Sequence, residues 1–209
     1  FSVLMARICY DIDWKSCLLC AVAAAGGEIE LRGTDPERFS TVLHSLSECG
    51  CDIIRTGAGV RLASDGNLRA PMPVITGPYP GFPTDMQPQI SVALCLADGT
   101  SVVTEGVYDN RYKYIQELGR MGANAQVDGC TAIINGVEGL HGAEVRACDL
   151  RAGAAVVIAG LCATGETVVT DIRFIERGYE NFVGKLRGVG ADIVLERDGA
   201  EQCAAAAAE

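Results

Sequence analysis

One pattern occurs three times along the sequence, and it constrains the fold more strongly than any other feature. In each copy a β-rich stretch begins at one glycine, and a helical stretch ends at a second glycine. The glycines of a pair are 23, 23 and 25 residues apart: Gly27 and Gly50, Gly99 and Gly122, Gly165 and Gly190. A repeat of about 70 residues normally forms one supersecondary unit per copy. We therefore expect three similar units, in which the second glycine caps the C-terminus of a helix.

The helices of each copy are of two kinds. The first kind is apolar nearly all round, which is typical of the protein interior, and it is predicted at residues 16–25, 90–97 and 152–163. The second kind is amphipathic, as in 38–46, where Phe39, Val42, Leu43 and Leu46 share one face. The pattern predicts an α/β fold that is inside-out, with three buried helices about a pseudo-threefold axis and the sheets outside them.

The third copy is shorter than the others. A strand is predicted after the second glycine of every copy, at 51–54, 123–127 and 191–195, but only the first two copies continue with another strand, at 60–62 and 131–134. The third offers one strand, at 192–197, and then an Ala-rich tail. We interpret residues 1–198 as one lobe, with repeats at 1–72, 73–146 and 147–198, and residues 199–209 as the tail. Because the chain begins with Phe1 and lacks a strand, we interpret it as part of a longer protein.

Composition excludes several classes of protein. The chain of 209 residues is 49% hydrophobic, which suits a sizeable core, and its net charge of -10 makes nucleic acid or an anionic membrane a poor partner. The longest uncharged run, 152–165, is shorter than the roughly 20 residues of a spanning helix.

Cys17 and Cys20 have the spacing of half a zinc or redox site, but no second pair matches it among the 10 cysteines, and only two histidines occur. We favour reduced structural thiols in a cytoplasmic protein.

Five collinear motifs carry a resemblance to a known family. They cover about residues 74–198 and read Tyr79-Pro-Gly-Phe-Pro-Thr-Asp85-Met-Gln, Tyr108-Asp-Asn-Arg-Tyr112, Arg120-Met-Gly-Ala, Asp149-Leu-Arg151-Ala and Glu176-Arg177-Gly-Tyr-Glu180. They resemble the C-terminal lobe of the UDP-N-acetylglucosamine 1-carboxyvinyltransferases, which are enolpyruvyl transferases. Residues 10–17 depart from the family pattern. The resemblance implies a lobe of three βαβαββ-type repeats and a missing N-terminal lobe that completes the cleft.

The resemblance also implies an activity. The family transfers the enolpyruvyl group of phosphoenolpyruvate to the 3-hydroxyl of UDP-N-acetylglucosamine, in the first committed step of peptidoglycan synthesis, without a metal or another cofactor. The family's mobile loop, which carries a Cys or Asp as the acid, and its Lys-Asn pair for phosphoenolpyruvate belong to the other lobe, so we expect this chain to be inactive alone. Two alternatives stay open: a lobe of the shikimate-pathway enolpyruvyl transferase, and a binding module that kept the fold without catalysis.

The resemblance assigns roles to four residues. Asp85 matches the family's catalytic carboxylate near the sugar hydroxyl, although an aspartate after Pro83 could instead cap a helix. Arg151 and Arg177 match arginines that contact phosphoenolpyruvate, and a planar guanidinium suits phosphate or carboxylate. Surface ion pairs are the alternative for both, and Arg177 is expected to open a helix. Val107 matches a contact to the nucleotide sugar through the backbone.

Two further expectations concern the surroundings of these residues. Asn110 and Arg111 are expected to brace a loop rather than to touch a substrate. The helix starts near Asp13, Asp85 and Asp149 are expected to lie at one end of the lobe, where the positive ends of their dipoles would favour an anion.

Overall fold

The computed structural model describes residues 4–7 and 12–196, and its elements fall into three successive groups. The first group comprises β1 (Leu4–Arg7), α1 (Ile12–Ala25), β2 (Gly27–Arg32), η1 (Pro36–Phe39), α2 (Ser40–Glu48), β3 (Asp52–Thr56) and β4 (Gly59–Ser64). The second comprises β5 (Val74–Ile75), η2 (Thr84–Met86), α3 (Gln87–Cys95), β6 (Thr100–Thr104), α4 (Lys113–Arg120), β7 (Asn124–Asp128) and β8 (Thr131–Asn135). The third comprises β9 (Glu144–Arg146), α5 (Leu150–Cys162), β10 (Val168–Thr170), α6 (Arg173–Glu176) and α7 (Phe182–Gly188).

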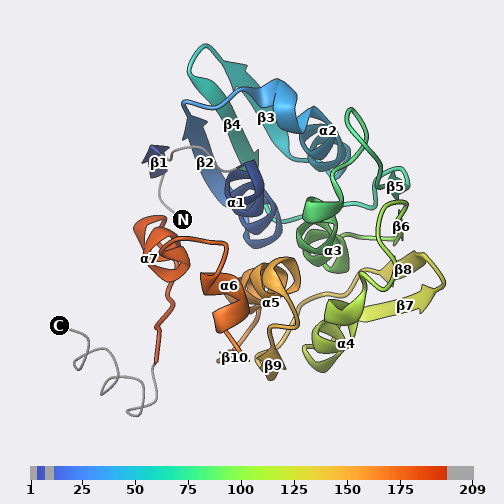
Figure 1. The fold of residues 1–209 in the computed structure, drawn as a ribbon. Coiled ribbons are helices and arrows are strands. Elements are labelled where there is room, and N and C mark those ends of the chain that lie inside the picture. The colour runs from blue at the N-terminus through green and yellow to red at the C-terminus, as the bar shows by residue number, and fades with distance from the viewer. Residues whose placement is uncertain (1–3, 8–11, 197–209) are drawn as a thin grey trace.

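The helices α1, α3 and α5 form the centre of the molecule, and each contacts the other two (Figure 1). Every residue of α3 is buried, and so is the run 152–159 of α5. Helices α1 and α5 are rich in alanine, and α5 also contains Gly153 and Gly160. The prediction of three buried helices inside the fold is confirmed.

The sheets lie around this helical centre (Figure 1). The first has the strand order β1-β2-β4-β3 and the second β5-β6-β8-β7, so the two share one topology. In each, the first two strands are parallel and the other neighbours are antiparallel. The short leading strands β1, β5 and β9 precede the central helices. In the first two groups the observed order matches the βαβαββ type implied by the family resemblance.

The amphipathic helices bury one face each against this centre. Helix α2 buries Val42, Leu43 and Leu46, as the spacing predicts, and contacts α1. Phe39 is buried too, but it ends the preceding turn η1 instead of lying within α2. Helix α4 buries Tyr114, Ile115 and Leu118 and contacts α5. After each second helix the predicted capping glycine has a positive φ, at 105° for Gly50, 92° for Gly122 and 85° for Gly190.

The third group differs from the other two at its C-terminal end, where they form the antiparallel pairs β3–β4 and β7–β8. Its sheet consists of β9 and β10 alone among the described residues. β10 begins at Val168 instead of at the predicted 165. The strand predicted at 191–195 is wrong, because residues 191–196 have no strand structure. In the first two groups this segment pairs with β4 or β8, and residues 12–196 provide no corresponding partner in the third. Residue 197 and the tail lie outside the described residues.

The described cysteines are free thiols, and five of them are buried: Cys17, Cys20, Cys49, Cys51 and Cys95. Burial raises the pKa of both Cys49 and Cys95 to about 12. Among residues 4–7 and 12–196, no three His, Cys, Asp or Glu side chains are grouped as a metal site requires. Nor does this part of the chain contain a helix with the length and hydropathy to cross a bilayer.

Candidate active site

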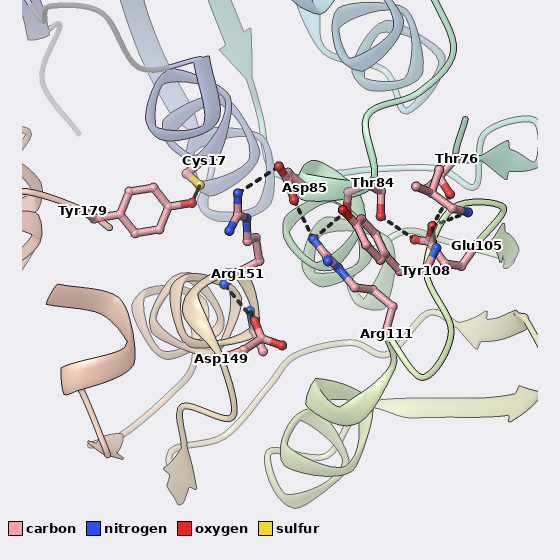
Figure 2. A network of polar contacts seen from close by, with 12 residues as sticks. Cys17, Thr76, Thr84, Asp85, Glu105, Tyr108, Arg111, Asp149, Arg151 and Tyr179 are labelled. Carbon is pink, nitrogen blue, oxygen red and sulfur yellow. Dashed lines mark hydrogen bonds and ion pairs between the residues drawn. The ribbon is translucent and has the colours of Figure 1, made fainter. Parts of the chain in front are cut away.

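Asp85 is held between two arginines that come from distant parts of the sequence (Figure 2). Its Oδ1 accepts a hydrogen bond of 2.6 Å from Arg111, in the loop before α4, and its Oδ2 accepts one of 2.9 Å from Arg151, in the first turn of α5. The Asp85 side chain is 33% exposed, and the side chains of Arg111 and Arg151 are 16% and 29% exposed. The group is therefore partly desolvated, and a ligand can still reach the carboxylate.

The structure bears on the interpretation of Asp85 as a helix cap. It lies inside the turn η2, between the caps Pro83 and Gln87, and no side-chain capping bond is present at the start of η2 or of α3. Its oxygens accept hydrogen bonds from guanidinium groups instead. Asp85 therefore makes no capping contact, and its role as the catalytic carboxylate stays a prediction.

Asp149 provides the capping contact that Asp85 does not. Its Oδ1 accepts hydrogen bonds of 2.9 and 2.8 Å from the backbone N–H groups of Arg151 and Ala152 at the start of α5. This N-cap fixes the first turn of the helix, so it also fixes the backbone from which Arg151 reaches Asp85. A cation in the first turn opposes the helix dipole, and the ion pair with Asp85 offsets that cost.

Arg111 belongs to the candidate site, although the sequence predicts only that it braces a loop. Besides the pair with Asp85, its guanidinium lies 5.1 Å from the ring centre of Tyr108, within the same loop. It braces the loop, as expected, but it does so against the candidate catalytic carboxylate. Arg111 lies in the motif Tyr108-Asp-Asn-Arg-Tyr112, which carries part of the family resemblance. The sequence does not show that this motif lies beside η2, because only the fold brings the two together.

Val107 lies in the loop after β6 and is 43% exposed. Its backbone N–H donates a hydrogen bond of 2.9 Å to Oε1 of the buried Glu105. That N–H is therefore occupied within the protein. A backbone contact from Val107 to a ligand would have to come from its carbonyl group.

Arg177 is placed differently from the sequence expectation. It is the C-cap of α6 instead of opening a helix, because α6 ends at Glu176 and α7 begins only at Phe182. The residue is exposed, and its guanidinium lies 5.6 Å from the ring centre of Phe174. None of the ion pairs between described residues involves Arg177, so the structure does not join it to the pair of arginines on Asp85.

The starts of the central helices lie close together, as the predicted arrangement requires. Helix α1 contacts both η2 and α5, and Figure 2 shows Cys17, Asp85 and Arg151 near one another. Sγ of Cys17 lies 3.8 Å from the hydroxyl of Tyr179, which brings the third group to the same end. Asp13 is in α1, but its side chain lies outside the described part. Two arginines against one carboxylate, beside helix N-termini, leave this end favourable for an anion.

The arrangement combines two chemical capacities. A partly exposed carboxylate can accept a proton from a hydroxyl group. Two guanidinium groups beside it can bind the oxygens of a phosphate or a carboxylate and stabilise negative charge that develops there.

Curated relatives share much of this sequence. The chain is 46% identical over 176 residues to a UDP-N-acetylglucosamine 1-carboxyvinyltransferase of Clostridium botulinum and 47% identical over 174 residues to one of Novosphingobium aromaticivorans. These alignments cover 84% and 83% of this chain but only 42% and 40% of the relatives. The chain thus spans less than half of the length of the relatives it matches, and the resemblance seen in the motifs is confirmed.

Solved structures and a family model agree with these relatives. The enolpyruvyl transferase NikO from Streptomyces tendae has a TM-score of 0.76 at 26% identity, covering 87% of this chain and 43% of that chain. An EPSP synthase from Acinetobacter baumannii shares the fold, with a TM-score of 0.69 at 22% identity over 93% of this chain and 45% of that one. The family model for EPSP synthase (3-phosphoshikimate 1-carboxyvinyltransferase) matches residues 5–186. This chain therefore belongs to the EPSP synthase family.

Proposed function

We propose that this chain is the C-terminal lobe of a UDP-N-acetylglucosamine 1-carboxyvinyltransferase. The observation that carries the proposal is the Asp85 carboxylate held by Arg111 and Arg151, at the helix starts where an anion is favoured. The identity of 46–47% to relatives of that name supports the choice of acceptor sugar. The reaction would take phosphoenolpyruvate and UDP-N-acetylglucosamine and release phosphate, as a step of peptidoglycan synthesis in the cytoplasm that serves cell shape and division.

In the proposed mechanism Asp85 is the base for the sugar. As the 3-hydroxyl oxygen forms its bond to C2 of phosphoenolpyruvate, Asp85 accepts the hydroxyl proton. The methylene carbon gains a proton from an acid on the other lobe, which gives a tetrahedral intermediate. Loss of a proton from the same carbon and departure of phosphate then produce the enol ether. For Asp85 to act as the base, one of its oxygens must give up the hydrogen bond from an arginine and accept one from the sugar hydroxyl.

The arginines would bind the second substrate. Arg151 would transfer hydrogen bonds from Asp85 to the phosphate or carboxylate of phosphoenolpyruvate, so arrival of this anion would also release the base. Arg177 is exposed in the present structure, so it would join the site when the lobes close. Val107 would contact the nucleotide sugar through its carbonyl group. We propose no cofactor, metal, nucleic acid or membrane partner.

The proposed site is incomplete without the other lobe. The relatives are more than twice as long as the aligned part of this chain, and the acid that protonates the methylene carbon must come from elsewhere. We therefore expect that the isolated chain of 209 residues does not turn over substrate.

The decisive experiment measures phosphate release by the natural polypeptide that contains this chain. With UDP-N-acetylglucosamine and phosphoenolpyruvate, turnover is expected, and Asp85→Asn should reduce kcat at least a hundredfold. Asp128→Asn, which removes the same charge at an exposed position of β7, is the matched control and should retain activity. Turnover with 3-phosphoshikimate instead would establish the alternative acceptor. Absence of turnover with both would favour the non-catalytic binding module.

A further inference from the structure

A second acidic residue of the site region, Glu105, is almost fully enclosed. It directly follows β6 and is 4% exposed. Its Oε1 accepts hydrogen bonds from the Thr76 hydroxyl at 2.6 Å and from the N–H groups of Val107 at 2.9 Å and Tyr108 at 3.2 Å. Its Oε2 accepts one of 2.9 Å from the Thr84 hydroxyl. All four donors of this network, shown in Figure 2, are uncharged.

The Glu105 network joins three segments that are separate in sequence. Thr76 follows β5, Thr84 begins η2, and residues 106–108 form the loop after β6. The loop is also fastened to Thr76 directly, because the Gly106 N–H donates a 2.8 Å hydrogen bond to its hydroxyl oxygen. A Cβ atom on Gly106 would lie 2.7 Å from the Thr76 carbonyl oxygen, so the two segments are in close contact.

Two of these segments carry the residues of the proposed mechanism. Thr84 is the immediate neighbour of Asp85 within η2, and the loop that begins at Glu105 carries Val107 and Arg111. A buried carboxylate is costly unless its oxygens are hydrogen-bonded. Moving a donor away from Glu105 would leave the buried carboxylate with an unsatisfied oxygen, which costs free energy. The network therefore resists relative movement of η2 and the loop.

We propose that Glu105 is a positioning residue, which sets the distance and orientation between the Asp85 turn and the loop that carries Val107 and Arg111. It touches no reacting atom. Its contribution is to hold the base in the geometry in which it can meet the sugar hydroxyl, because small misplacements of a catalytic group reduce the rate strongly. This inference rests on the proposed role of Asp85.

The sharpest variant is Thr84→Val, which removes the single hydrogen bond between Glu105 and the Asp85 turn and keeps the side-chain shape. In the natural polypeptide, we expect kcat to fall roughly ten- to a hundredfold, with the KM for UDP-N-acetylglucosamine changed less than threefold. Thr84→Ser should restore kcat. Thr104→Val is the matched control, because the Thr104 hydroxyl lies 3.1 Å from that of Thr131 and is not among the four donors to Glu105. It should leave kcat unchanged.

A pair of variants at Glu105 separates hydrogen bonding from charge. Glu105→Gln can still accept with its carbonyl oxygen and donate to the Thr84 hydroxyl, so it should retain most activity. Glu105→Ala should lose it. Equal loss in Glu105→Gln and Glu105→Ala would overturn the proposal, since the charge itself would then be required.

The outcomes also distinguish this inference from the proposed function. If Asp85→Asn abolishes turnover while Thr84→Val has the kcat of Thr104→Val, Glu105 does not position the base and the inference is wrong. If Asp85→Asn retains full turnover, the proposed role of Asp85 has failed and the inference falls with it, although the transferase activity stands. If the unaltered polypeptide shows no turnover, the proposed function itself has failed. Melting temperatures of all variants identify any that fail to fold, and for a misfolded Glu105→Ala the comparison rests on Thr84→Val and Thr84→Ser.

Discussion

Oδ2 of Asp85 lies 2.9 Å from the guanidinium of Arg151, a residue 66 positions later in the chain. The contact links the turn before one central helix to the first turn of another. It pairs the candidate base with a candidate ligand of the anionic substrate. In this conformation the two groups are paired with each other, so a ligand that binds either of them must replace the other as its partner.

The first prediction concerns Arg151 itself. In the natural polypeptide, Arg151→Lys should reduce kcat/KM for phosphoenolpyruvate roughly ten- to a hundredfold, because an ammonium group cannot reproduce the planar, two-pronged contact of a guanidinium. Initial rates at varied phosphoenolpyruvate provide the measurement. Arg173→Lys is the control, since Arg173 pairs with Asp171 on the surface at 73% exposure. Equal kcat/KM for the two variants would contradict a ligand role for Arg151.

The N-cap of α5 allows a second prediction. Asp149→Ala removes the acceptor for two backbone N–H groups, so it should lower the free energy of unfolding by about 1 kcal/mol. Asp149→Ser, which retains a capping oxygen, should lose less. Urea denaturation of the 209-residue chain followed by circular dichroism is the measurement. Parental stability in Asp149→Ala would show that the cap is dispensable.

Gly122 is predicted to tolerate no side chain. Its φ is +92°, and a Cβ atom there would lie 2.7 Å from ring atoms of His141. Gly122→Ala should therefore destabilise the chain by roughly 1–3 kcal/mol. Gly119→Ala is the matched control in the same stretch, because apart from its chain neighbours and the backbone of its own helix no atom lies within 4 Å of the added methyl group. It should be neutral or slightly stabilising, and equal destabilisation by both variants would refute the conformational argument.

The buried thiols predict a loss of stability in alkali. Burial raises the pKa of Cys49 and of Cys95 from an ordinary value of 9.0 to about 12. Between pH 9 and 12 the unfolded chain releases thiol protons that the folded chain retains. The free energy of unfolding should therefore fall with rising pH, by up to about 1.4 kcal/mol per pH unit for each thiol.

Two variants check the origin of that slope in denaturation experiments between pH 8 and 10.5. Cys95→Ala removes one buried thiol and should make the fall shallower. Cys130→Ala removes an exposed cysteine and should keep the parental slope. A slope that is the same in both variants would mean that Cys95 does not contribute.

The main architecture was predictable because its signals are local. Residues 90–97 and 152–163 contain almost no polar side chains, so the burial of α3 and α5 could be inferred from the local sequence. The glycines that follow α2, α4 and α7 mark helix ends through their own backbone freedom. The motif around Asp85 was specific enough to indicate a family, and the comparisons confirmed that resemblance.

Other features depended on partners that the sequence does not identify. The strand expected at 191–195 is not formed in the structure, because a strand requires a neighbour and none of the described residues of the third group pairs with it. Arg177 ends a helix instead of opening one, since the local pattern did not show where α6 stops. Glu105 looks like any acidic residue after a strand, until the fold surrounds it with four donors.

The sequence by itself therefore determined the buried helices and the family, because periodicity and motifs are properties of neighbouring residues. Only the tertiary structure decided that Arg111 and Arg151 meet on Asp85, and that Glu105 joins the Asp85 turn to the loop of Val107. These contacts form between side chains 21 to 66 residues apart. Their geometry depends on how the central helices pack, which no local pattern specifies.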